Sequence, residues 1–204
     1  ADVGGTHLLS RAPGRLGAYL GLTAARMGPG DAIHAGFADR YLPEADWPAL
    51  IARLEATGDT ACIPDHAPPP SPLAAEAARI DRLFAGSDVT DIIQRLQEDD
   101  SDTSSAALKA IRRNSPLAMA ATLGLLDRLD ASTTIRDALT GEYRFTWRAM
   151  DQGDFLEGIR AQIIDKDRNP RWRDTLDTLD PARVAAMLAP LGADDITFQE
   201  ETGP

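Results

Sequence analysis

The sequence is poor in several kinds of residue, and each shortage excludes a class of protein. One cysteine, Cys62, stands in 204 residues, which excludes an internal disulfide framework and a multi-cysteine zinc site. Lysine and arginine number 21 against 32 aspartates and glutamates, a net charge of −11. A chain this acidic lacks the basic face that nucleic acids and anionic membranes require, so we expect neither as a partner. No apolar run reaches the roughly 18 residues of a membrane span.

The same shortages indicate a helical globular protein. Charged residues at 26% and hydrophobic residues at 43% are typical of a globular chain. Alanine favours helices, whereas aromatic residues, which favour strands, make up only 5%. We therefore expect a mainly α fold, with at most one or two short strands near residues 37–42, where apolar and polar residues alternate. The lone cysteine and the lack of a signal-peptide pattern favour a reducing, cytoplasmic location.

A proline-rich segment divides the chain. Proline fixes its own backbone angle, so residues 61–72 are expected to form a semi-rigid linker. Residues 1–60 combine many glycines with short helices, and residues 73–204 are helical almost throughout. Within that last part, residues 132–151 and 154–165 have the apolar spacing of two long helices. Ser115-Pro116 predicts the start of a further helix, and Ser87 or Asp88 is expected to cap a helix that begins near Val89.

Metal and thiol chemistry find little support in the sequence. His7, His34 and His66 lie far apart, without the close spacing of metal ligands, so we expect no metal site and read them as surface or locally hydrogen-bonded histidines. Nothing near Cys62 is expected to lower the pKa of its thiol, and its neighbourhood favours a structural role.

The first residues, Asp2-Val3-Gly4-Gly5-Thr6, allow two interpretations. Asp2 could cap the helix that follows, which is the commonest use of an aspartate in such a place. Alternatively, the glycines let a ligand approach the backbone, and the carboxylate acts on that ligand. The local pattern by itself favours the cap.

A second segment of interest runs from Asp154 to Trp172. Phe155, Ile159 and Ile163 would share one face of a helix, and Gly158 within it suggests a tight contact. Asp165-Lys166-Asp167 follows as a charge cluster. By residue type alone this cluster reads as a solvated helix end, and the functional alternative is a lysine that reaches a phosphate.

Taken together, these segments resemble the crotonase superfamily, and within it the branch of 3-hydroxyisobutyryl-CoA hydrolases. Ala1-Asp2-Val3-Gly4-Gly5 corresponds to that branch's Pro-Asp-Val-Gly-Gly, with alanine in place of the proline. The run 16–26, Ser115-Pro116 and Glu142-Tyr143-Arg144 also match in order. The most specific match is Asp-Phe-x-Glu-Gly-x-Arg-Ala, followed by Ile-Asp-Lys-Asp and Pro-x-Trp, within residues 154–172.

The resemblance implies a fold and a set of site residues. It implies that the chain is the C-terminal, helical part of an α/β spiral fold, with residues 1–60 as the tail of the core. Asp2 becomes a catalytic residue that contacts the substrate near its thioester, with Gly4 and Gly5 beside it in the substrate site. Lys166 becomes a candidate for binding the phosphates of coenzyme A. Family members are almost twice as long, and their partner glutamate and oxyanion hole correspond to positions before Ala1.

The expected activity is therefore acyl-CoA thioester hydrolysis in valine breakdown, and we expect the chain alone to be inactive. Coenzyme A would be part of the substrate, and no separate cofactor is expected. Two alternatives stay open, an enoyl-CoA hydratase or isomerase and a non-catalytic helical module for assembly. The apolar faces of the helices lead us to expect a homo-oligomer.

Overall fold

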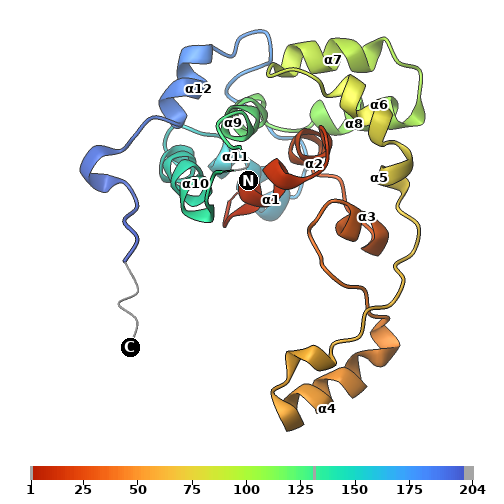
Figure 1. The fold of residues 1–204 in the computed structure, drawn as a ribbon. Helices are drawn as coiled ribbons and strands as arrows, with labels where there is room; N and C mark the ends of the chain where they lie inside the picture. Colours follow the sequence, from red (N-terminus) through yellow and green to blue (C-terminus); the bar gives the residue numbers. More distant parts are fainter. Residues whose placement is uncertain (1, 131, 200–204) are drawn as a thin grey trace.

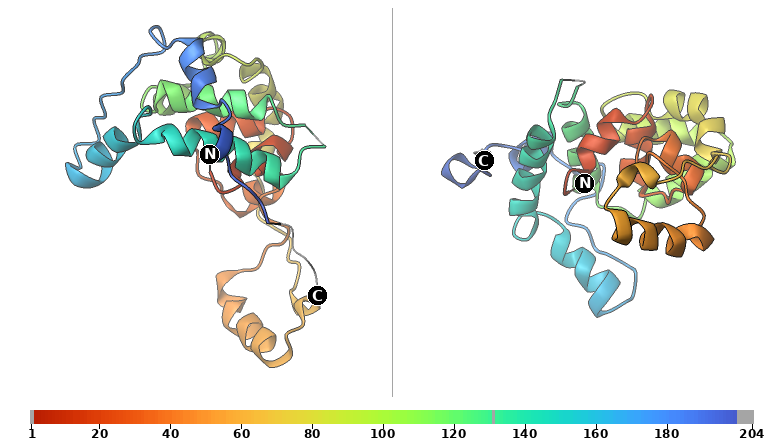
Figure 2. Two further views of the ribbon diagram at one scale, coloured as in Figure 1. Left: turned by 90° about the vertical axis from the view of Figure 1, so that its left-hand side faces the viewer. Right: turned by 60° about the horizontal axis from the view of Figure 1, so that its bottom comes forward.

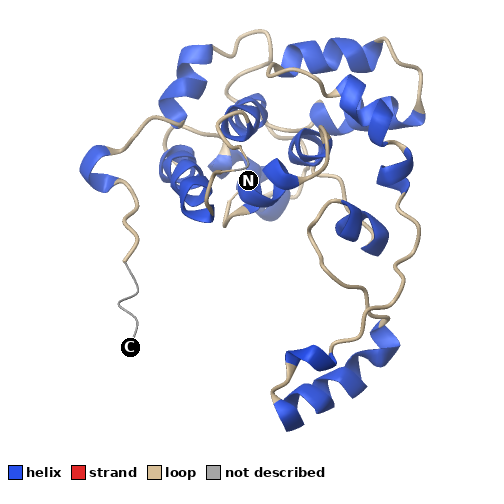
Figure 3. Cartoon of the chain, in the orientation of Figure 1, coloured by secondary structure: helices blue, strands red, loops and turns tan. Residues whose placement is uncertain are grey.

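The computed structural model describes residues 2–130 and 132–199, and these are predominantly helical (Figures 1 and 3). Ala1 and residues 200–204, which belong to the predicted core tail and helical region, lie outside the described residues. The elements are α1 (Gly5–Arg11), α2 (Leu16–Thr23), α3 (Pro29–His34), η1 (Glu44–Asp46), α4 (Trp47–Thr57), η2 (Thr60–Cys62), α5 (Pro72–Ala75), α6 (Ala77–Leu83), α7 (Val89–Gln97), α8 (Asp102–Ile111), α9 (Pro116–Leu126), α10 (Ile135–Ala149), α11 (Phe155–Ile159), η3 (Arg160–Ile164), α12 (Pro181–Met187) and η4 (Gly192–Asp194). Of the η elements, η3 is a π-helical turn and the others are 3₁₀ turns.

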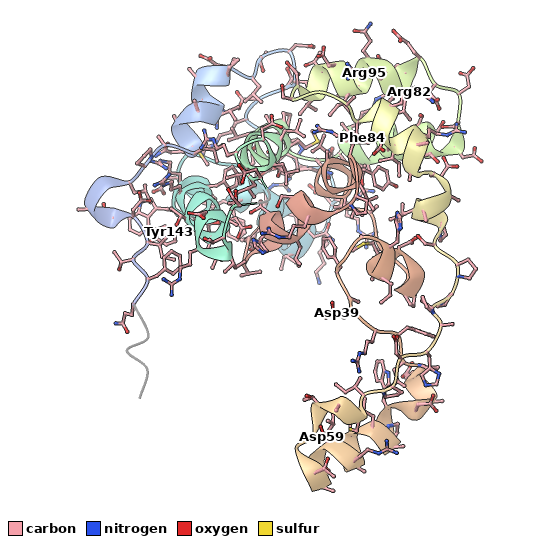
Figure 4. The ribbon with its side chains drawn as sticks, in the orientation of Figure 1. Asp39, Asp59, Arg82, Phe84, Arg95 and Tyr143 are labelled. Atoms are coloured by element: carbon pink, nitrogen blue, oxygen red, sulfur yellow. The ribbon has the colours of Figure 1, made fainter. Side chains whose placement is uncertain are left out.

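The main core lies where α2 meets α6, α8 and α9, with α7 packed on α6, α8 and α9. Helices α2 and α9 are apolar on most sides, as expected for helices that other helices surround. Phe84, labelled in Figure 4, directly follows α6 and meets the ring of Tyr19 on α2 edge to face at 5.2 Å. The fully buried side chains of this core include Leu22, Ile80, Phe84, Ile92, Leu96, Ile111 and Leu123.

Helix α1 crosses α2 at a glycine. A Cβ atom on Gly17 would lie 1.9 Å from the carbonyl oxygen of Leu9, an atom that belongs to backbone and cannot move aside. Only glycine therefore permits this approach. The crossing determines where α1, and hence the Asp2 segment before it, sits on the helical body.

Helix α4 and its two flanking turns form an arm that stands away from the body (Figure 1 and the left view of Figure 2). Its two ends come together through an antiparallel bridge between Tyr41 and His66. The possible short strand near residues 37–42 is reduced to this bridge, and the described residues form no sheet. A strand needs a neighbour for its hydrogen bonds, and residues 37–40 have none of that kind.

Helices α10 and α12 also pack on α9. Helix α12 contacts both α9 and α10, with Ala121, Leu125 and Leu188 buried between them. The guanidinium of Arg148 on α10 donates to the carbonyls of Met187 and Ala189, which lie at the end of α12. Arg144, one turn earlier, binds Asp195 through two hydrogen bonds of 2.8 and 2.7 Å. These contacts fix α10 between the body and the C-terminal segment.

Several predicted helices are confirmed, and one is wrong in extent. The predicted helix after Ser115-Pro116 is α9, and Asp88 caps α7 through a hydrogen bond from the amide of Thr90. The long helix expected over residues 154–165 is instead α11 followed by the π-turn η3. The division into residues 1–60, 61–72 and 73–204 stays a prediction, although one core contains side chains from both sides of the linker. Within the described residues, no helix has the length and apolar character that crossing a bilayer would require.

Candidate active site

Asp2 is held by a turn with unusual backbone angles. Val3 and Gly4, which follow it, have φ angles of +49° and +86°. For a β-branched residue such as valine, this left-handed conformation is strained by about 1–3 kcal/mol. At Gly4 a Cβ atom would also lie 2.8 Å from the Cδ1 atom of Ile135, so glycine is favoured there on two grounds. Such a turn persists only where the surrounding contacts hold it.

The contact that holds the turn is a buried carboxylate from α10. Glu142, only 2% exposed, accepts hydrogen bonds from the amide of Gly4 at 2.7 Å and from the amide of Thr6 at 2.7 Å. The hydroxyl of Thr6 donates to the same carboxylate at 2.5 Å. Glu142 therefore caps α1, and the interpretation of Asp2 as the cap is wrong. The residue that caps α1 therefore comes from a distant part of the sequence.

Sequence reasoning missed the role of Glu142. A glutamate within an amphipathic helix is exposed by default, because burying its charge is costly unless the charge is paired. The available signal was its alignment with Ala138 and Ala149, which share its face of α10 and are both buried. Those small side chains indicate that something approaches this face closely.

With capping assigned to Glu142, the carboxylate of Asp2 is left exposed at the edge of a cavity of about 370 Å³. The other walls come from α10, the residue after it and the first residue of α11, and most are apolar. The residues that line this cavity are Asp2, Phe145, Thr146, Ala149, Met150 and Phe155. A single carboxylate beside apolar walls suits a small ligand that has one polar end and one apolar end.

Gly4 and Gly5 lie next to Asp2, but their amides are already used. The amide of Gly4 donates to Glu142, and that of Gly5 donates to the carbonyl of Asp2 at 2.8 Å. Their role here is to shape the turn that presents Asp2. Their predicted contact with a substrate stays a prediction.

Two of the segments that carry the resemblance, Ser115-Pro116 and residues 154–172, contact each other in the structure. Ser115 caps α9 by accepting a hydrogen bond from the amide of Ala118, and its hydroxyl donates to the buried carboxylate of Asp154 at 2.6 Å. The other oxygen of Asp154 accepts a hydrogen bond from the amide of Arg173. Trp172 continues this connection, because its indole N–H donates to the carbonyl of Arg113 at 3.1 Å.

Arg160 organises the rest of the 154–172 segment. Its guanidinium binds Glu157 through two hydrogen bonds of 2.9 and 2.7 Å, Asp165 at 2.6 Å and Asp167 at 2.7 Å. We call this set of four residues the Arg160 cluster. The backbone leaves α-helical geometry at Arg160, and the π-turn η3 brings both aspartates back to the same side chain.

Lys166 lies between those two aspartates, in the left-handed conformation at φ +57°. It is exposed and is not among the residues that line the cavity of Asp2. The two predicted site positions are thus in different places, and contact of Lys166 with coenzyme A stays a prediction. The tight contact expected at Gly158 is absent, because a Cβ atom there would lie an ordinary 3.8 Å from the ring of Trp172.

The Arg160 cluster is expected to be sensitive to acid. Hydrogen bonds from Arg160, and then from the amide of Arg171, lower the pKa of Glu157 from its ordinary 4.5 to about 2. Because the folded pKa is the lower one, the stabilisation is complete above pH 4.5 and is lost as the pH falls towards 2. We expect the fluorescence of Trp172 to change over that range.

The measurement requires replacement of the other two tryptophans, Trp47 and Trp147, by phenylalanine, so that Trp172 alone reports. In Glu157→Gln the fluorescence should already be altered at pH 7, whereas Glu55→Gln, at an exposed site on α4, should behave like the parent protein. An emission that stays constant from pH 5 to 2 would contradict this account of the cluster.

The remaining candidates stay outside the site. Among the described residues no group of three histidine, cysteine, aspartate or glutamate side chains is placed to hold a metal ion. Cys62 is free and half-buried in the α4 arm. His34 differs from expectation, because its Nε2 atom is buried without a hydrogen-bond partner among the described residues.

Comparisons with known proteins agree with this fold. The chain is 31% identical to 3-hydroxyisobutyryl-CoA hydrolase from Gallus gallus and 30% identical to that from Homo sapiens, over 96% and 97% of its length. It spans only 54% of each of these relatives. Among solved structures, an enoyl-CoA hydratase from Rhodobacter sphaeroides is 61% identical and superposes with a TM-score of 0.92, covering 97% of this chain and 58% of the other.

A carnitinyl-CoA dehydratase from Mycobacterium thermoresistibile is 38% identical, with a TM-score of 0.90 over 98% of this chain and 58% of the other. The family model described as enoyl-CoA hydratase/isomerase matches residues 1–188. That match takes in α1 to α12, and hence both Asp2 and the Arg160 cluster. The chain therefore belongs to the enoyl-CoA hydratase/isomerase family of the crotonase superfamily.

Proposed function

We propose that the protein to which this chain belongs is an acyl-CoA thioester hydrolase of the 3-hydroxyisobutyryl-CoA type, acting in valine breakdown. The observation that supports this most is the exposed carboxylate of Asp2 beside an apolar cavity. The curated relatives, named 3-hydroxyisobutyryl-CoA hydrolases, support the choice of substrate. The free Cys62 agrees with a reducing compartment, and a cytoplasmic location is part of the proposal.

The chemistry requires a carboxylate. Hydrolysis adds the oxygen of water to the acyl carbonyl carbon and breaks the bond from that carbon to sulfur, and the departing thiolate takes up a proton. Asp2 can serve as a general base towards water or as a nucleophile on the thioester. Negative charge that develops on the carbonyl oxygen needs N–H donors, and the amides of Gly4 and Gly5 are already engaged.

Positive charge for the phosphates of coenzyme A is available near Lys166. Arg113 and Arg168 line a cavity of about 170 Å³ together with Asn114 and Trp172. This gathering of positive charge in a chain of net charge −11 supports a local site for an anionic ligand. In this proposal Lys166 contributes from the same loop as Arg168.

The proposal includes the expectation that the 204-residue chain alone is inactive, since it spans about half the length of the hydrolases that it matches. The test is a thiol-release assay with 3-hydroxyisobutyryl-CoA, which compares this chain with a form extended to the full length of those relatives. Activity of the extended form alone is expected. Turnover by the 204-residue chain would contradict the expected inactivity, and no thiol release by either form would refute the hydrolase assignment.

Hydratase activity is the nearest alternative, because a solved relative at 61% identity is described as an enoyl-CoA hydratase. The 154–172 segment favours the hydrolase, since its match to the hydrolase branch takes in the whole Arg160 cluster. Crotonyl-CoA distinguishes the two activities. Loss of its absorbance at the enoyl double bond, without release of thiol, would favour the hydratase.

A second function, assembly through helices, is supported by the α4 arm. Trp47 and Ile51 are 51% and 53% exposed, and with Leu50 and Leu54 they form one apolar face. We propose that this face joins copies of the chain. Size exclusion over a concentration series should show a larger species that Ile51→Glu weakens. Ala49→Glu, which adds the same charge on the opposite face, should leave that species unchanged, and a monomer at all concentrations would exclude the proposal.

A further inference from the structure

Asp2 lines one of two neighbouring cavities. The first is the cavity of about 370 Å³ described above, which we call the proximal compartment. The second measures about 400 Å³ and extends along α11 towards Trp172, and we call it the distal compartment. Each compartment is within the size range of small-molecule sites, about 300–1,000 Å³. Three residues line both of them, Phe145, Ala149 and Phe155.

Two of the three shared residues, Phe145 and Phe155, are aromatic, and neither is fully buried. Phe155 is 54% exposed at the start of α11, and Met150, which lines the proximal compartment, is 53% exposed. Large apolar side chains left exposed together next to a cavity are typical of a surface that a ligand or partner covers. Among the described residues that line the proximal compartment, Asp2 is the only ionisable one.

We propose that the proximal compartment binds the acyl group of the substrate and that Phe155 limits its length. This inference rests on the proposed thioester chemistry. The polar end of the acyl group faces Asp2, its apolar part packs on Met150 and Ala149, and the ring of Phe155 bars a longer chain from the distal compartment. Short acyl groups are therefore preferred.

An acyl group suits the proximal compartment better than a protein segment does. The compartment combines one carboxylate with short apolar walls, which suits a compact ligand carrying a single hydrogen-bonding or electrophilic group. Each of the relatives described above is named for an acyl-CoA compound. In an apolar pocket a single methylene group changes specificity by about 10- to 200-fold, so one aromatic ring is enough to set chain length.

The test measures kcat/KM of the full-length enzyme for isobutyryl-CoA and octanoyl-CoA. Phe155→Ala should raise the ratio of octanoyl to isobutyryl activity by about 10-fold or more. Leu156→Ala is the matched control, because Leu156 is the next residue, is 52% exposed, and lines neither compartment. Phe155→Leu, which shortens the side chain less, should give an intermediate ratio. Far-UV circular dichroism verifies that each variant is folded.

The outcomes separate this inference from the proposed function. If isobutyryl-CoA is hydrolysed but Phe155→Ala leaves the ratio unchanged, the acyl site is refuted and the hydrolase assignment stands. If thiol is not released but crotonyl-CoA is hydrated, the hydrolase assignment fails. The acyl site is then tested with the ratio of 2-octenoyl-CoA to crotonyl-CoA. Loss of stability in Phe155→Ala with an unchanged ratio indicates that another part of the protein fills the compartment, and it overturns the inference.

Discussion

Replacing Asp2 with asparagine is expected to lower kcat/KM for thioester hydrolysis by about 10²–10⁴-fold, the usual contribution of a general base or acid. Asparagine keeps the size of the side chain, but it can neither accept a proton from water nor attack the thioester. Both roles considered for Asp2 need the negative charge, so the loss does not depend on which of them operates. The measurement is the rate of thiol release by the full-length enzyme.

The same variant should fold normally, and this is what makes the result informative. Asp2 is exposed, and the cap of α1 is provided by Glu142. The melting temperature of Asp2→Asn should therefore match that of the parent protein. Asp39→Asn is the control, since Asp39 is an exposed carboxylate on the loop that leads to α4 (Figure 4). Equal losses of activity in the two variants would show that Asp2 is not a catalytic residue.

Glu142→Ala is expected to destabilise the protein by about 3 kcal/mol or more. The substitution leaves three buried donors, the amides of Gly4 and Thr6 and the hydroxyl of Thr6, without their acceptor. It also releases the contact that holds the strained turn at Val3 and Gly4. For a chain of this size, 3 kcal/mol corresponds to a fall in melting temperature of about 6–12 °C.

Urea unfolding followed by circular dichroism measures this effect, with two variants as a scale. Thr6→Val removes one of the three donors and should cost about 1 kcal/mol. Glu55→Ala, at an exposed position on α4, should stay within about 0.5 kcal/mol of the parent protein. A loss in Glu142→Ala no greater than that of Glu55→Ala would show that the buried carboxylate does not hold α1.

Glu142 connects stability to the proposed chemistry. It does not line the compartment of Asp2, and it acts through the turn that presents Asp2. It is therefore a positioning residue. In Glu142→Gln, one oxygen is retained as an acceptor and the other is replaced by a donor that faces an N–H group. We expect this variant to lie between Glu142→Ala and the parent protein in stability.

Much of the helical layout could be predicted, because caps and helical periodicity are local signals. Ser115-Pro116 predicts the start of α9, and Ser87 or Asp88 that of α7, and the structure has Ser115 and Asp88 as the two caps. The break after Ile159 could not be predicted in this way. Residues 154–165 keep a helical apolar spacing, but the structure turns at Arg160 because three carboxylates converge on one guanidinium. Whether the three carboxylates meet Arg160 depends on the path of the backbone over residues 157–167.

The sequence by itself determined the mainly helical class, the family and the segment that holds Asp2, since these depend on composition and on ordered motifs. Only the tertiary structure decided what Asp2 is free to do. The amides at the start of α1 need an acceptor, and whether Asp2 or another residue supplies it depends on what the fold brings there. Packing of α10 against α1 brings Glu142, and the carboxylate of Asp2 is left exposed at the edge of an apolar compartment. The few cysteines, aromatics and positive charges indicated the class of this protein. The burial of Glu142 at the start of α1 left Asp2 free as a candidate site residue.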